Sequence, residues 1–132
     1  MKDYNKLCTS DTNNCTVIAV SKALNVSMSE AYAALDKAGR IHGDGAHMSQ
    51  VKCAVTLLGG RVINQTHKIY HLRSRLGKAI TVKSVGEWLS TGRYIMSTAT
   101  HAFALLHGTV DDWCYDSKAH VGTVFKITKG VR

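Results

Sequence analysis

The sequence predicts a single α+β domain in which N-terminal helices pack on a small twisted antiparallel sheet. Apolar residues recur at helical spacing in the first half of the chain, whereas short alternating segments separated by glycines fill the last third. Helices followed by a run of strands are typical of an α+β domain. The length of 132 residues suits one domain, so we treat residues 1–132 as a single unit.

Four helices are expected from the apolar spacing and from their end signals. They span about residues 15–24, 27–38, 47–58 and 81–90. The second has the clearest boundaries, because Ser27 and Glu30 form a capping box and Gly39 is a typical C-terminal stop.

Five strands are expected from short apolar or alternating segments. They span about residues 61–65, 94–98, 101–106, 109–115 and 122–128. His107-Gly108 predicts a tight hairpin turn between the third and fourth of them. Residues 66–80 are basic and favour neither a helix nor a strand.

The positive charge is unevenly distributed. The net charge is +8, and no acidic residue occurs between Asp44 and Glu87. The basic residues of this interval, from Lys52 to Lys83, form either a solvated face or a surface for an anionic partner, such as nucleic acid or an acidic protein. Only Tyr70 adds an aromatic ring to the densest part, so the nucleic-acid signal is weak.

The N-terminus has no apolar core of a signal peptide, and no stretch approaches the roughly 18 apolar residues of a membrane span. We therefore expect a cytoplasmic protein without membrane contact. The four cysteines show no CxxC spacing, so they are expected to be thiols, with neither a disulfide framework nor a zinc site. No cofactor is implied.

Cys15 is the strongest candidate for a chemical role, because it opens an apolar helix. A helix N-terminus and a neighbouring imidazolium both stabilise a thiolate. His101 opens a strand and could be the base, with Asp112 on the return strand orienting it. Strand alternation allows only one of Asp111 and Asp112 to face the same way as His101. The bland alternative is a buried core cysteine, which is the commoner role of a free thiol.

These segments resemble those of small papain-like cysteine peptidases found in bacteriophage and bacterial genomes. The likeness is carried by Asn14-Cys15 before a helix, by a helix ending in Ala-Gly-Arg40, and by a Gly-x-Tyr strand leading into His101-Ala-Phe-Ala. The resemblance implies a papain-like fold, with Cys15 as nucleophile, His101 as general base and acid, and Asp112 as the orienting acid. A phage-encoded protein would act in the host cytosol or in the virion.

One departure from the family concerns the oxyanion donor. Papain-like enzymes usually carry a glutamine shortly before the cysteine, where this chain has Thr9. Asn13 or Asn14 could donate instead, together with the backbone N–H of Cys15.

The sequence leaves two candidate functions. The first is a thiol hydrolase that cleaves an amide or isopeptide bond of a protein, a peptide or a cell-wall cross-link through a thioester acyl-enzyme. The alternative is a weak or inactive domain serving as a phage structural or host-interaction protein through its basic surface.

Overall fold

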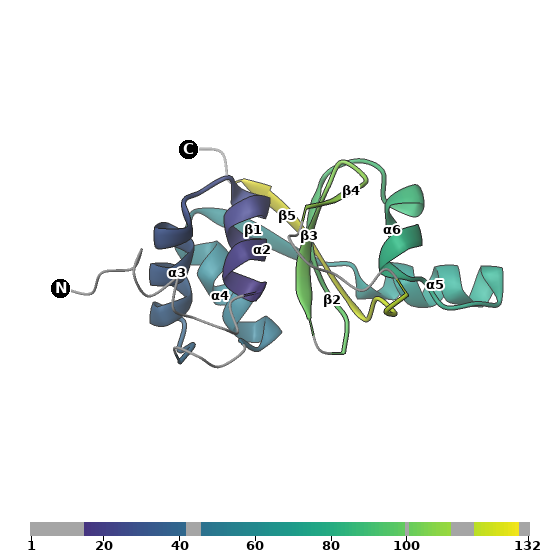
Figure 1. Cartoon of the computed structure of the whole chain (residues 1–132), viewed down its shortest axis with the longest axis horizontal. Helices are drawn as coiled ribbons and strands as arrows, with labels where there is room; N and C mark the ends of the chain where they lie inside the picture. The colour runs from purple at the N-terminus through teal and green to yellow at the C-terminus, as the bar shows by residue number, and fades with distance from the viewer. Residues whose placement is uncertain (1–14, 42–45, 100, 112–117, 130–132) are drawn as a thin grey trace.

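The computed structural model describes residues 15–41, 46–99, 101–111 and 118–129. In this part of the chain, a five-stranded sheet separates two groups of helices (Figure 1). Three helices lie on one face of the sheet and two on the other, so both faces are covered. The expected α+β class is confirmed.

The sheet is antiparallel throughout. Its strands are β1 (Gly60–Asn64), β2 (Arg93–Ser97), β3 (Ala102–Leu106), β4 (Thr109–Asp111) and β5 (Thr123–Lys129). They lie in the order β1-β5-β2-β3-β4, so the last strand of the chain lies between the first two. This long-range pairing joins the middle of the chain to its C-terminal part.

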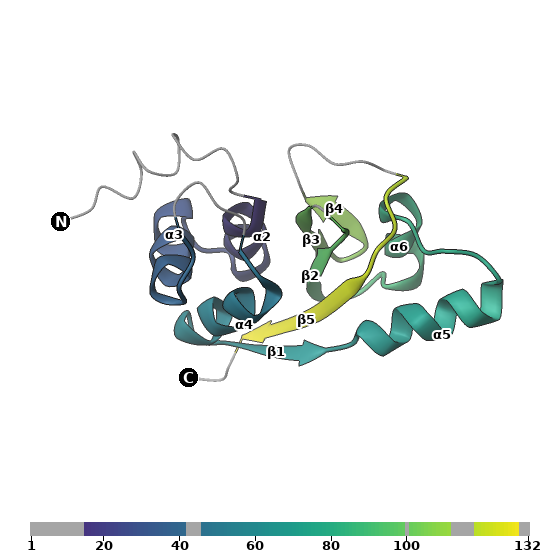
Figure 2. The same cartoon turned by 90° about the horizontal axis from the view of Figure 1, so that it is seen from below.

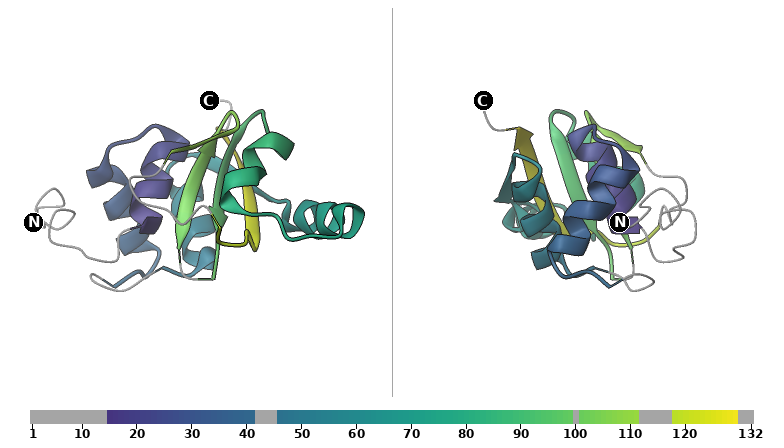
Figure 3. Two further views of the ribbon diagram at one scale, coloured as in Figure 1. Left: turned by 45° about the vertical axis from the view of Figure 1, so that its right-hand side comes forward. Right: turned by 90° about the vertical axis from the view of Figure 1, so that its left-hand side faces the viewer.

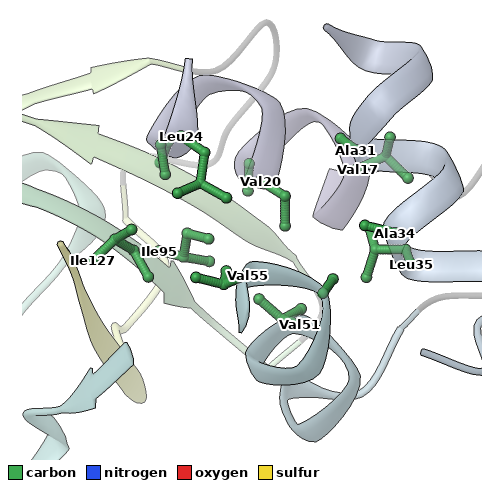
Figure 4. Packing of buried hydrophobic residues seen from close by; sticks show 14 of the residues in the cluster. Val17, Val20, Leu24, Ala31, Ala34, Leu35, Val51, Val55, Ile95 and Ile127 are labelled. Carbon is green, nitrogen blue, oxygen red and sulfur yellow. The ribbon is translucent and has the colours of Figure 1, made fainter. Parts of the chain in front are cut away.

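The first group of helices consists of α2 (Cys15–Leu24), α3 (Met28–Lys37) and α4 (Met48–Leu57). Their buried side chains share one core with the strands (Figure 4). Val20 and Leu24 of α2 lie on Ile95 of β2, and Leu35 of α3 closes the outer side. Helix α2 is therefore held between the sheet and the other two helices.

The second group consists of α5 (Thr66–Leu76) and α6 (Val82–Trp88) on the opposite face. Tyr94, Met96 and Phe103 alternate with residues of the first core along β2 and β3, and they form a second core with this group. Figures 2 and 3 show α5 extending away from the sheet, on the side opposite to α3.

Most expected elements are present near their predicted bounds. In α3, the Ser27 side chain accepts a hydrogen bond from the backbone N–H of Glu30 at 3.0 Å, and Gly39 has a φ of 102°. Helix α5 was not predicted, because residues 66–80 showed no clear apolar period. Only Ile69 of α5 is fully buried, which explains the weak signal.

The expected hairpin turn is also confirmed. His107 and Gly108 connect β3 to β4 with φ values of 49° and 84°, so both central residues have the positive φ of a type I′ turn. The turn lies against α6, where Gly86 leaves room for the backbone carbonyl of Gly108. The described part of the return strand ends at Asp111; residues 112–115 of the expected strand lie outside the described residues.

Candidate functional site

Cys15 is the first residue of α2, as the sequence predicts. Its side chain is half-buried, whereas the next two residues, Thr16 and Val17, are buried. The backbone N–H groups in the first turn of a helix have no acceptor within the helix, and the helix dipole is positive there. The thiol therefore lies at an end of a packed helix that favours negative charge.

His101 lies directly before β3 and is also half-buried. The backbone N–H of Thr98 donates to the carbonyl oxygen of His101 at 2.8 Å, which closes a short turn between β2 and β3. Because β3 packs along α2, this turn lies at the same end of the molecule as the N-terminus of α2.

One cavity of about 300 Å³ is lined by both Cys15 and His101. Its wall is formed by the start of α2, the start of α4 and the connection between β2 and β3. The lining residues are Cys15, Thr16, Ala46, His47, Met48, Ser97, Thr98, Ala99, His101 and Ala102. The structure therefore brings together two candidate residues that are far apart in the sequence.

The proposed third member, Asp112, lies outside the described residues, and so does the proposed oxyanion donor Asn13. The neighbouring Asp111 is described, and it is paired with Ala104 in the register of β3 and β4. Its Oδ1 lies 3.8 Å from Nζ of Lys22, in the last turn of α2. Asp111 therefore lies two turns along α2 from Cys15, beside a lysine.

Sequence reasoning missed His47 as part of this cavity. His47 is the N-cap residue of α4, and its backbone N–H donates to Oε1 of Gln50 at 2.9 Å. The sequence predicts His47 only as the start of the third helix, at about residues 47–58. Its place directly before an apolar helix, which resembles that of Cys15, was the available signal. The cavity is thus lined by a second histidine, and by Ser97 and Thr98.

The described residues contain no cluster of three or more histidine, cysteine, aspartate or glutamate side chains that could hold a metal ion. Cys53 is exposed on α4, away from the residues that line the cavity, and Cys8 and Cys114 lie outside the described ranges. In the part of the chain that the structure describes, no helix is both long enough and apolar enough to cross a membrane.

Comparisons with protein-family models, with curated proteins and with solved structures found no match to this chain. The function is therefore inferred from the residues around Cys15 and from their arrangement.

Proposed function

We propose that this protein is a papain-like thiol hydrolase that cleaves an amide or isopeptide bond through an acyl-enzyme. The proposal is carried by one observation: Cys15, at the start of α2, and His101, before β3, line the same cavity. A thiol at a helix N-terminus next to an imidazole is the arrangement needed for nucleophilic catalysis by cysteine.

In this mechanism, His101 takes the proton of the Cys15 thiol, and the thiolate sulfur attacks the substrate carbonyl carbon. The tetrahedral intermediate collapses, the C–N bond breaks, and the imidazolium of His101 gives its proton to the leaving amine. His101 then takes a proton from a water molecule, whose oxygen attacks the thioester carbon. The C–S bond breaks and releases the acid, and the imidazolium of His101 returns its proton to the Cys15 thiolate.

The first turn of α2 supplies backbone N–H groups for the oxyanion, including that of Cys15 itself. Asn13 is the proposed side-chain donor, and Asp112 is the proposed partner that orients the imidazole. Each such donor typically contributes about a hundredfold or more in rate. The sequence near Cys15 and His101 thus contains one candidate each for the nucleophile, the base, the orienting acid and the oxyanion donor.

The cavity that Cys15 and His101 share is small and partly apolar. Its volume of about 300 Å³ is near the lower end of typical ligand sites. Ala46, Ala99 and Ala102 contribute small apolar surfaces, and Met48 adds an adaptable one.

Selective alkylation tests the proposal. At about pH 6 an ordinary thiol, with a pKa near 8.5, is almost fully protonated and reacts slowly with iodoacetamide. We expect fast labelling of Cys15 and slow labelling of the exposed Cys53, read for every cysteine by peptide mass spectrometry. His101→Ala should slow the labelling of Cys15 by about a hundredfold.

The matched control is His107→Asn. His107 is exposed in the turn after β3, and asparagine tolerates its positive φ of 49°. This variant should label like the wild type. Equal and slow labelling of all cysteines in the wild type would sink the hydrolase proposal.

The alternative function is a binding protein on the same fold, in which the basic interval carries the activity. It is favoured by the exposure of all seven lysine and arginine side chains between residues 46 and 86. Slow labelling of Cys15, together with capture of an anionic partner, is the result that this alternative predicts.

A further inference from the structure

Most of the surface of helix α5 is exposed to solvent. Its start is tied to the sheet, because the backbone N–H of Gln65 donates to the carbonyl oxygen of Val124 at 2.8 Å, and the backbone N–H of Val124 donates to Oγ1 of Thr66 at 3.1 Å. Ile69 is its one fully buried residue, and nearly all of its later residues are exposed. The helix therefore projects from the sheet as an arm (Figure 2).

The arm and its surroundings are strongly basic. Residues 46–86 contain seven lysine and arginine residues and no aspartate or glutamate. Lys68, Arg73 and Lys78 lie on α5 or directly after it, and all three are exposed. Among the described residues, none of these three side chains has a carboxylate partner. Three exposed cations therefore lie on α5 or directly after it.

Two cavities flank the arm. One, of about 400 Å³, is lined by His67, Lys68, His71, Leu72, Trp88 and Leu89, so it lies between α5 and α6. The other, of about 530 Å³, is lined by Tyr70, Arg73, Ser74, Gly77, Lys78 and Ala79. Neither includes Cys15 or His101. We call these two sets of residues the α5 surface.

Each cavity contains an exposed aromatic ring beside a cation. Tyr70 is 61% exposed, and the guanidinium carbon of Arg73 lies 5.9 Å from the centre of its ring. Trp88 is 44% exposed and shares its cavity with Lys68. Exposed aromatic rings next to cations are the surfaces on which unpaired bases stack.

We propose that the α5 surface binds single-stranded nucleic acid. Lys68, Arg73 and Lys78 contact phosphates, while bases stack on Trp88 and Tyr70. Charge complementarity selects an anionic chain, and the two rings distinguish a nucleic acid from an acidic protein. Bases inside a duplex cannot reach these rings, so an unpaired strand fits better than a duplex. The site is separate from the thiol cavity and does not depend on its chemistry.

Binding of a fluorescent oligonucleotide of about 15 unpaired nucleotides to the full chain, followed by anisotropy, tests the proposal. Replacing Trp88 or Tyr70 by alanine should weaken binding by about tenfold. Lys68→Gln should weaken it and reduce the slope of log K against log salt by about 0.7, the contribution of one phosphate contact to a single strand.

Lys37→Gln is the matched control, because Lys37 is an exposed lysine on α3, across the sheet from α5. It should retain both the affinity and the salt slope. Tyr70→Ala keeps the test valid if Trp88→Ala folds poorly, since Tyr70 contributes little to the core. Circular dichroism checks each variant.

Two results would overturn the proposal. One is binding that weakens equally with Lys37→Gln and Lys68→Gln and does not respond to loss of either ring, which indicates attraction to net charge alone. The other is equal affinity for polyglutamate or for a duplex with the same number of phosphates. Cys15→Ala should leave nucleic-acid binding unchanged. The nucleic-acid proposal and the hydrolase proposal can therefore fail independently of each other.

Discussion

Nζ of Lys22 lies 3.8 Å from Oδ1 of Asp111, so the return strand β4 is joined to the C-terminal end of α2. Both side chains are about half exposed, so the pair contributes at most about 1 kcal/mol to stability. Its importance is positional. It places Asp111 beside Lys22, whereas the thiol cavity lies at the other end of α2.

This position predicts different effects for two neighbouring aspartates. Asp111→Asn should leave the alkylation rate of Cys15 at about pH 6 unchanged, because Asp111 does not line the cavity. Asp112→Asn should lower it by about tenfold or more, since an orienting carboxylate stabilises the imidazolium that accompanies the thiolate. Rates measured by mass spectrometry compare the two. If Asp111→Asn slows the alkylation of Cys15 and Asp112→Asn does not, then Asp111 is the orienting residue and the assignment to Asp112 is wrong.

Gly86 predicts an unusual sign for a glycine substitution. In a helix interior, Gly→Ala normally stabilises by about 0.5–1 kcal/mol. A Cβ on Gly86, however, would overlap the backbone carbonyl oxygen of Gly108 in the β3–β4 turn. Gly86→Ala should therefore destabilise the protein by about 1–3 kcal/mol in urea unfolding. In the control Gly122→Ala, the nearest atom to the new Cβ lies 3.8 Å away, so we expect a much smaller change.

Truncating Leu35 should show how much the first core contributes to the free energy of unfolding. This residue of α3 is fully buried between α2 and α4. Leu35→Ala should lower the free energy of unfolding by about 2–5 kcal/mol, because it removes apolar contacts and leaves a cavity. Leu57→Ala on α4 is the control: this side chain is 53% exposed, so its loss should stay within about 0.5 kcal/mol. Losses of similar size would contradict the packing described for α3.

The sequence predicted those elements whose signals are local. The bounds of α3 follow from Ser27, whose side chain caps the helix at the backbone N–H of Glu30, and from Gly39; the hairpin follows from His107-Gly108. Helix α5 was missed because a helix that buries mainly Ile69 has almost no apolar period. The place of β5 between β1 and β2 could not be predicted, since it depends on pairing between distant segments.

For the site, the residue types and their elements singled out Cys15 and His101, which line one cavity; their catalytic roles stay predictions. His47 was missed because its sequence context suggests only a helix cap; its place in the cavity depends on how α4 packs beside α2. Asp112 and Asn13 lie outside the described residues, so their roles stay predictions.

The pH dependence of Cys15 alkylation tests the central claim most directly. The rate constant should be measured from about pH 5 to pH 9 in a Cys53→Ser background, with and without His101→Ala. A thiolate–imidazolium pair predicts a substantial rate at the acidic end, lost in His101→Ala, which should follow the single ionisation of an ordinary thiol. Identical profiles for the two proteins, both with the midpoint of an ordinary thiol near 8.5, would contradict the account.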